Sequence, residues 1–185
     1  MGSISLCHRW MPVALLVMAG TLLGCPRVLY LDYQPSTAVT GHGPVWVESF
    51  LYAGHPRGLM QQKELEGSAQ DVEALYLSQN IGDFVADALK KELMLAGYTL
   101  TSEAMRRVTG TIEHFFLEYV GQQEQRFQIR ATFQVAGPGA DAYTATCHVD
   151  RQQIRSWMKS GLLIGQGVKD CLEDFLTHAQ AAGVL

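Results

Sequence analysis

Apolar and polar positions alternate through three successive stretches of the chain, at 108–120, 126–136 and 143–150. A period of two residues is typical of strands that bury one face. Short polar or glycine-rich connections separate the three stretches, so they predict an antiparallel meander. In the first stretch the apolar set changes phase near Glu113 and His114, which predicts a β-bulge at that point.

A period of 3.6 residues predicts two helices, at 78–97 and at roughly 162–182. The first has a hydroxyl side chain, Ser78, at the position of an N-cap. It ends at Gly97, which predicts a left-handed C-cap with Tyr98 folded back on the last turn. Three glycines weaken the first turns of the second helix, so that helix is expected to begin later than residue 162.

The stretch 45–52 is apolar on both sides and predicts a central strand. Its expected sides are Val45, Val47 and Leu51 on one, and Trp46, Phe50 and Tyr52 on the other. Residues 98–100 are expected to be extended, and 57–77 fits a long loop or a hairpin equally well. Two one-sided helices and a sheet with one polar face predict a single α+β domain over 45–185, a two-layer sandwich with a mostly antiparallel sheet.

The N-terminal 24 residues have the pattern of a secretory signal peptide. Arg9 precedes an uncharged apolar run over 11–23, and a small residue, Gly24, follows. The run is too short for a transmembrane helix, which needs roughly 20 apolar residues. Myristoylation is a weaker alternative, because Leu6 stands where a Ser or Thr is needed.

The end of this run, Leu22-Leu23-Gly24-Cys25, resembles the lipobox of bacterial lipoproteins. The resemblance implies a diacylglycerol thioether on Cys25, cleavage after Gly24, and acylation of the new amino group by a chain such as palmitate. In Gram-negative bacteria an Asp after the lipidated Cys retains the protein at the inner membrane. Here Pro26 follows, so the resemblance implies the periplasmic face of the outer membrane.

Residues 25–44 are expected to be the lipidated Cys and a tether, because the segment is rich in Pro, Gly, Ser and Thr and has no periodicity. Within it, 28–31 fits either part of the tether or a short strand laid on the domain.

A wider resemblance follows from the order of these elements. A lipobox, a first strand, a helix ending in Ala96-Gly97-Tyr98, a meander and a terminal helix resemble the YajG-type bacterial lipoproteins over roughly 45–179. The specific matches are Ser78, Gly97 and Tyr98, which are structural positions. The resemblance therefore implies no catalytic residues.

Composition excludes one class of partner. Apolar residues make up 48% of the chain, enough for a sizeable core. Cleavage of the signal removes Arg9 and leaves 13 of the 14 Lys and Arg against 18 Asp and Glu, a formal charge of −5. That charge argues against nucleic acid and against electrostatic adhesion to anionic lipid. Membrane attachment must then depend on the lipid at Cys25.

The four cysteines are expected to be in different chemical states. Cys7 leaves with the signal and Cys25 carries lipid, so Cys147 and Cys171 remain in an oxidising compartment. One disulfide between them is predicted, since both lie on apolar faces that a helix packed on the sheet would bring together. The alternative is two buried, reduced cysteines acting as small apolar residues.

Candidate chemistry is sparse, so we expect no enzyme, no cofactor and no metal site. The histidines lack zinc-ligand spacing; pairing of neighbouring strands could bring His114 near His148, but two imidazoles are too few for a zinc site. No Gly-x-Ser-x-Gly motif is present. The one cluster to retain is Arg126, Arg130 and Arg151, which either contacts an anionic envelope ligand or belongs to a solvated sheet face.

These observations leave two functions. The first is a non-catalytic, membrane-anchored accessory or interaction component of the cell envelope, with a protein partner. The second, by analogy with small α+β lipoproteins, is a lipid- or polysaccharide-binding module auxiliary to envelope transport or assembly. An exposed apolar patch would favour a protein partner, and a closed apolar pocket between helix and sheet would favour lipid.

Overall fold

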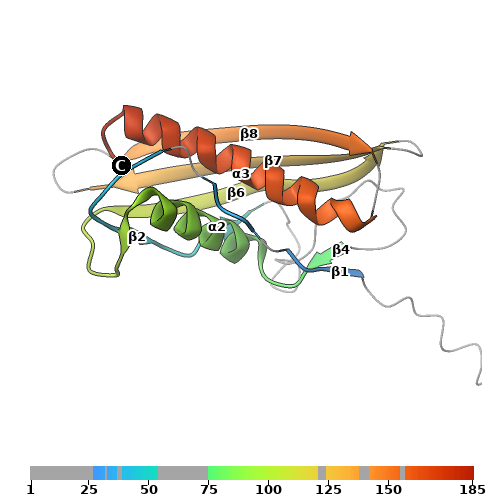
Figure 1. The fold of residues 1–185 in the computed structure, drawn as a ribbon, viewed down its shortest axis with the longest axis horizontal. Helices are drawn as coiled ribbons and strands as arrows, with labels where there is room; N and C mark the ends of the chain where they lie inside the picture. Colours follow the sequence, from blue (N-terminus) through green and yellow to red (C-terminus); the bar gives the residue numbers. More distant parts are fainter. Residues whose placement is uncertain are drawn as a thin grey trace, which may run out of the picture.

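The computed structural model describes residues 27–31, 33–36, 39–53, 75–120, 124–137, 142–154 and 157–185. In this part of the chain two helices cover one face of a mixed sheet, and a separate pair of short strands lies at one end (Figure 1). The α+β, two-layer architecture expected from the sequence is confirmed.

The described elements follow one another as β1 (Arg27–Leu29), β2 (Pro44–Val47), β3 (Leu51–Tyr52), β4 (Leu75–Leu77), α2 (Ile81–Ala96), β5 (Thr99–Leu100), β6 (Arg107–Val120), β7 (Glu124–Ala136), β8 (Tyr143–Ile154) and α3 (Trp157–Ala181).

The main sheet has the strand order β5-β2-β6-β7-β8, and β3 also pairs with β6. β6, β7 and β8 are antiparallel neighbours, so the predicted meander is confirmed. β2 and β3 run parallel to β6, and β5 runs parallel to β2. β1 and β4 form a second, two-stranded parallel sheet.

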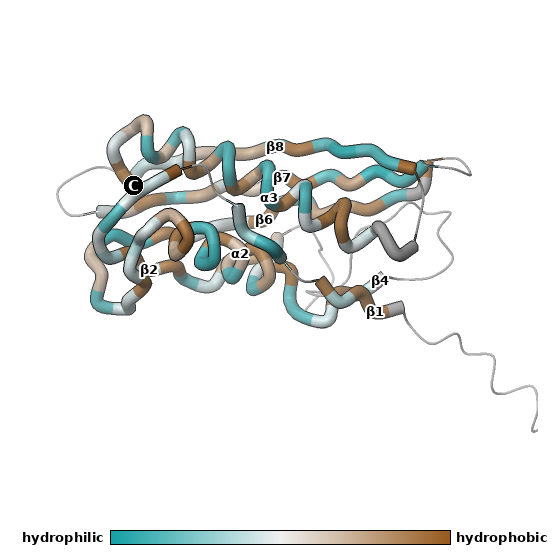
Figure 2. The backbone as a smooth tube through the Cα atoms, viewed as in Figure 1, coloured by the Kyte–Doolittle hydropathy of each residue, from teal (hydrophilic) through white to brown (hydrophobic). Residues whose placement is uncertain are grey.

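The alternation along the long strands determines which face is buried, and Figure 2 shows hydrophobic and hydrophilic residues alternating there. The apolar residues of β7, from Phe127 to Val135, are at most 3% exposed and face the helices. The register of β6 against β7 shifts between Ile112 and His114, which confirms the predicted bulge. Because of that shift, Ile112 and Phe115 are both fully buried.

Aromatic side chains fill the space between the helices and the sheet. Phe133 of β7 stacks on Phe175 of α3 with ring centroids 4.5 Å apart. Phe115 and Phe127 meet edge to face at 4.9 Å. Aromatic pairs at these distances contribute about 0.5–1.5 kcal/mol beyond the area that they bury.

The first helix differs from the prediction at its start but not at its end. α2 begins at Ile81 with Asn80 as N-cap, so the expectation that Ser78 caps it is wrong. The reason is that the amide of Ser78 donates to the Leu29 carbonyl at 3.0 Å and thereby extends the pairing of β1 with β4. At the other end Gly97 has a left-handed φ of 103°, and the Tyr98 amide donates to the Leu93 carbonyl, as predicted.

The last helix begins at Trp157, earlier than predicted, so the glycines near its start do not delay it. At Gly167 a Cβ would lie 2.5 Å from the Phe127 ring. The missing side chain therefore allows the helix to approach the sheet closely. Packing of this kind outweighs a helix-propensity penalty of about 1 kcal/mol per glycine.

The stretch 45–52 forms two short strands, β2 and β3, and the expected assignment of its sides is wrong beyond the break. Phe50 and Tyr52 are buried with Val45 and Val47, whereas Leu51 is 59% exposed. The ring of Phe50 packs 5.7 Å from that of Phe133. The alternation of buried and exposed residues therefore changes between Val47 and Phe50: odd-numbered residues face the core before this point, and even-numbered residues face it afterwards.

The described part of the predicted tether at 25–44 packs on the domain and is not a free spacer. β1 pairs with β4, which decides in favour of a strand at the start of this segment. Leu29 and Tyr33 are 6% and 4% exposed and belong to the core. Of the 57–77 segment, only β4 lies among the described residues.

Candidate functional site

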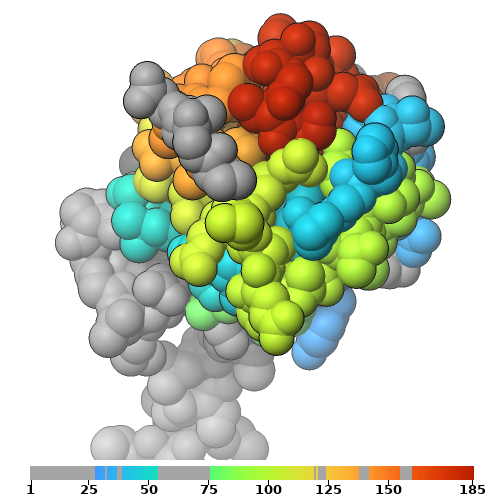
Figure 3. Space-filling view, turned by 90° about the vertical axis from the view of Figure 1, so that its left-hand side faces the viewer, coloured from blue at the N-terminus to red at the C-terminus, as the bar shows by residue number. Residues whose placement is uncertain are grey.

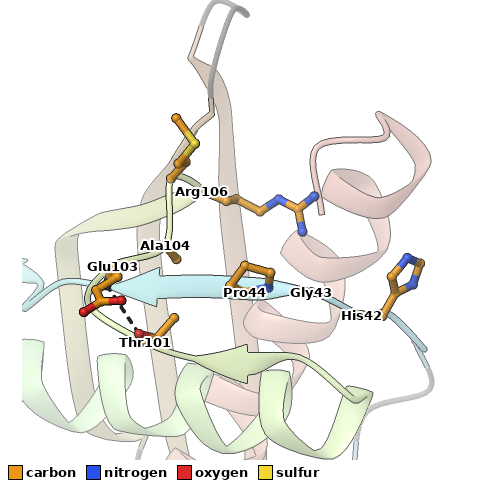
Figure 4. Close-up of a pocket in the computed structure, with 8 residues that line it drawn as sticks. His42, Gly43, Pro44, Thr101, Glu103, Ala104 and Arg106 are labelled. Carbon is orange, nitrogen blue, oxygen red and sulfur yellow. Dashed lines mark hydrogen bonds between the residues drawn. The ribbon is translucent and has the colours of Figure 1, made fainter.

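β5 and β6 pair with opposite edges of β2, so the loop that connects β5 to β6 passes across the end of β2. The Thr101 amide donates to the Val45 carbonyl at 3.1 Å, and the Trp46 amide donates to the Arg106 carbonyl at 2.9 Å. The 101–106 loop is therefore tied to β2 at both of its ends. Beside this crossing lies a solvent-open cavity of about 560 Å³, here called the β2 cavity (Figure 4). Its lining residues are His42, Gly43, Pro44, Thr101, Glu103, Ala104, Met105 and Arg106.

Two backbone hydrogen bonds hold the wall of the cavity that carries His42. The Gly41 amide donates to the Ala96 carbonyl at 2.8 Å, and the Gly43 carbonyl accepts from the Thr99 amide at 3.0 Å. A Cβ on Gly41 would lie 2.0 Å from the Tyr98 ring, so that position accepts only glycine without rearrangement. This close approach fixes His42 at the end of α2.

Arg106 and Glu103 supply a positive and a negative side chain to the lining of the β2 cavity. Figure 4 shows its side chain extending toward the side on which His42 lies, while Glu103 lies on the other side. Within the described part of the chain, no carboxylate forms an ion pair with Arg106, whereas the neighbouring Arg107 pairs with Glu48 at 3.8 Å. The Arg106 guanidinium is thus available to an anionic group of a ligand or partner.

Exposed apolar side chains surround this end of the molecule. Met105, at the rim of the cavity, is 72% exposed, and Met94 and Leu95 in the last turn of α2 are 55% and 56% exposed. Figure 3 faces this end and shows the segment before β2 beside the chain that follows α2. Methionine and arginine are enriched in protein interfaces, so Arg106 and the exposed Met105 side by side have the composition of a recognition surface.

The open face of the sheet carries Arg126 and Arg130, and both are already paired. The Arg126 Nε donates to Asp150 Oδ1 at 2.8 Å, and the Arg130 Nε lies 2.9 Å from Glu113 Oε2. Hydrogen bonds from Arg126 lower the pKa of Asp150 to about 2. This arrangement has the features of a solvated, internally neutralised sheet face.

Arg151 does not join the other two arginines. The alternating stretch at 143–150 predicted that Arg151 lies just beyond the strand, and this is wrong, because β8 continues to Ile154 and contains Arg151. It stands opposite Phe127 on the face covered by helices, and its guanidinium pairs with Asp170 of α3. The structure therefore separates the three-arginine cluster, and anion binding by its members stays a prediction.

His114 and His148 are not on neighbouring strands, because β7 lies between β6 and β8. His114 is the register partner of Arg130, and Arg130 is in turn the partner of His148. The His114 ring stacks instead on Phe116, with centroids 5.3 Å apart. Among the described residues, no three His, Cys, Asp or Glu side chains are grouped as metal ligands.

The predicted disulfide between Cys147 and Cys171 is present. Their Cα atoms are 5.4 Å apart, within the usual range for a bridge, and both residues are at most 2% exposed. The bond links β8 to α3 through the core, as the apolar faces of the two elements required.

The predicted lipidation site, Cys25, lies outside the described residues, as does the whole predicted signal peptide. Of the described helices, neither α2 nor α3 combines the length and hydrophobicity that crossing a bilayer requires.

Comparison with known proteins identifies a fold but not a family. No protein-family model and no curated protein matches this chain. The DUF330 protein XCC0632 from Xanthomonas campestris is similar in structure, with a TM-score of 0.66 and 11% identity, over 84% of this chain and 96% of that one. An uncharacterized protein matches with a TM-score of 0.57 and 14% identity, over 83% and 98% of the two chains. These likenesses show a shared fold alone.

Bacterial lipoproteins also occur among the structural matches. Rare lipoprotein B from Shewanella oneidensis has a TM-score of 0.42 and 16% identity, over 65% of this chain and 94% of that one. A similarity of this size supports no inference about function.

The β2 cavity was not predictable from the sequence. Its lining residues come from two segments, 42–44 and 101–106, which are far apart in the chain. The sequence Gly41-His42-Gly43-Pro44 does indicate a turn at one wall of the cavity. Which of Arg106 and Arg107 has a carboxylate partner depends instead on tertiary pairing with Glu48.

Proposed function

We propose that this chain is a non-catalytic, lipid-anchored protein of the bacterial cell envelope that binds another envelope protein at the β2 cavity. The observation that carries the proposal is the Arg106 guanidinium, which has no carboxylate partner among the described residues, beside the exposed side chain of Met105. A partner that presents a carboxylate next to an apolar side chain would complement both groups.

The anchor is supported by the sequence Leu22-Leu23-Gly24-Cys25. Two or more acyl chains on Cys25 give stable membrane attachment, whereas one chain is marginal. Changing Cys25 to Ser should leave the precursor uncleaved, which intact-mass spectrometry of membrane fractions detects. A mature chain that begins at an unmodified residue would contradict the anchor.

The destination follows from the residue after the anchor. Pro26, in place of Asp, supports the periplasmic face of the outer membrane in a Gram-negative cell. Sucrose-gradient fractionation should place the protein with outer-membrane markers, and recovery with inner-membrane markers would refute this location.

The interior of the fold bears on the choice between partner classes. Between the described parts of the helix layer and the sheet, the Phe133 ring of β7 stacks on the Phe175 ring of α3, beside further buried rings of β6 and β7. The surface of the β2 cavity is open and combines a cation with methionine. These features favour a protein partner over a lipid held inside the domain.

Affinity purification of the tagged lipoprotein from membranes tests the proposal, with co-purifying proteins and lipids both identified by mass spectrometry. A specific protein partner should be recovered, and its yield should fall when Arg106 is changed to Ala. Arg107→Ala is the matched control, because Arg107 adjoins Arg106, is 57% exposed and is paired with Glu48. Equal yields from both variants would refute recognition through Arg106, and lipid or polysaccharide without a protein would favour the alternative binding module.

A further inference from the structure

The end of the molecule opposite the β2 cavity carries a second group of exposed apolar side chains. In Figure 1 the N-terminal strand β1, the ends of β6 and β8 and the start of α3 all lie at this end. Five exposed residues there are here called the anchor-end rim: Val28 (40%), Tyr30 (82%), Val120 (37%), Ile154 (79%) and Leu162 (63%).

Strand pairing and packing place the members of the rim at the same end of the molecule. Val120 and Ile154 belong to the same row of the sheet, since each is a register partner of Glu124. α3 begins three residues after Ile154, and Leu162 lies in its second turn. The Tyr30 carbonyl lies 3.9 Å from the Cβ position of Gly161, so Tyr30 adjoins that turn.

Chain length determines what can face this rim. Only one residue separates Cys25 from the start of β1 at Arg27. Two peptide units span at most roughly 7 Å, since consecutive Cα atoms are 3.8 Å apart. A lipid chain on Cys25 would therefore hold the bilayer surface within about the span of two peptide units from the start of β1. The end of the molecule at which β1 lies would then face the membrane.

We propose that the anchor-end rim rests in the interface of the bilayer, so that the protein stands on the membrane with its long strands directed away from it. This inference rests on the lipid anchor of the proposed function. Tyrosine is suited to the headgroup region because its ring is apolar and its hydroxyl is polar. The Glu124 carboxylate, which accepts a hydrogen bond from Gln152, lies between Val120 and Ile154 and limits the contact to the headgroup region.

The proposed orientation also places the β2 cavity. β6 begins at Arg107 beside the cavity and ends at Val120 in the rim. The 13 steps between its 14 residues rise by roughly 44 Å at about 3.4 Å per residue. The cavity would then face the periplasm, far from the anchoring membrane, where a second envelope protein has access to it.

Site-directed fluorescence on the full-length, lipidated protein tests the contact. In the mature chain Cys25 is blocked by lipid and Cys147 is bridged to Cys171, so an introduced cysteine is the single free thiol. Ile154→Cys and Leu162→Cys place an environment-sensitive probe in the rim. Met105→Cys is the control, because it is 72% exposed at the opposite end.

Each labelled protein is reconstituted into phosphatidylcholine and phosphatidylethanolamine vesicles, and the vesicles are floated. Probes at 154 and 162 should shift to the blue and be quenched by lipids brominated near the headgroup more than by lipids brominated near the chain ends. The probe at 105 should respond to neither. Urea unfolding of each labelled variant checks that the fold is retained.

The outcomes distinguish the rim from the anchor. Protein that floats with the vesicles but shows no quenching at 154 and 162 would retain its anchor and overturn the inference. Equal quenching at all three positions would also overturn it, because the protein would then lie flat. Protein that does not float would refute the anchor itself and the inference with it.

Discussion

Replacing Tyr33 with Phe tests how firmly the segment before β2 is fastened to α2. The Tyr33 Oη donates to Glu92 Oε1 at 2.5 Å, and the two residues are 4% and 0% exposed. Burial and the Glu92 carboxylate raise the pKa of Tyr33, so its hydroxyl remains protonated and donates at neutral pH. The substitution removes this donor but keeps the ring, which packs edge-on against Phe84 with centroids 6.4 Å apart.

The expected loss follows from what remains around the carboxylate. Among the described residues, Glu92 Oε1 would keep only the Ser36 amide as a donor, at 3.2 Å, and Oε2 has none. Removing one partner of a buried hydrogen bond to a charged group costs about 1.5–3 kcal/mol, because water does not replace the donor. We therefore expect Tyr33→Phe to lower the free energy of unfolding by about 2 kcal/mol. For a domain of this size that loss corresponds to roughly 4–8 °C in Tm.

Urea unfolding of the oxidised protein, followed by circular dichroism, measures this loss. Tyr30→Phe is the matched control: Tyr30 is 82% exposed, and its change should stay within about 0.5 kcal/mol. In a Glu92→Gln background the effect of Tyr33→Phe should shrink, since a neutral amide loses less when its donor is removed. The reasoning is refuted if the two tyrosine variants are equally stable, or if the full loss persists beside Gln at position 92.

Three further perturbations separate covalent, steric and electrostatic contributions to stability. Changing Cys147 and Cys171 together to Ala should lower the free energy of unfolding by about 3 kcal/mol, as expected for a loop of this length; two reactive thiols in denatured, unreduced wild-type protein would contradict the bridge. Gly41→Ala should cost roughly 1–3 kcal/mol, because its Cβ would meet an aromatic ring, while Gly165→Ala, with no atom within 4 Å of its Cβ, should be neutral or stabilising in thermal unfolding. Asp150→Asn should cost about 0.5–1 kcal/mol at pH 7, a small value because the ion pair is partly exposed. The folded pKa of Asp150, about 2, lies below the ordinary 3.8, so its contribution is present above pH 4 and is lost as the pH falls through 2; a difference in urea unfolding between variant and wild type that stays constant down to that pH would refute the assignment.

The parts of the fold that were predictable depend on neighbours in sequence. The alternation over 126–136 requires only that one side of a strand be buried, and β7 has that pattern. The left-handed conformation at Gly97 follows from the absence of a Cβ, which is a property of one residue. The bulge beside Ile112 was visible because a phase change in an apolar pattern must be accommodated by an extra residue.

The parts that failed depend on partners far away in the chain. Ser78 is a good N-cap by type, but its amide pairs with Leu29, some fifty residues earlier, and that long-range hydrogen bond moves the start of α2. The glycines at the start of α3 disfavour a helix locally, yet Gly167 fits against Phe127 and the helix forms. A prediction from sequence relies on local propensities, which are worth up to about 1 kcal/mol per residue. The free energy of one well-packed tertiary contact can be larger than such a propensity.

The sequence by itself determined the fold class, the meander, the cysteine pair and the resemblance of Cys25 and its neighbours to a lipobox. Each of these is encoded by residue type at fixed spacing. Tertiary structure alone decided that Arg126 and Arg151 lie on opposite faces, and that Arg107, unlike Arg106, has a carboxylate partner among the described residues. The physical reason is that a cavity or an unpaired charge is a property of what surrounds a residue, and here the surroundings come from strands that pair only after the chain has folded.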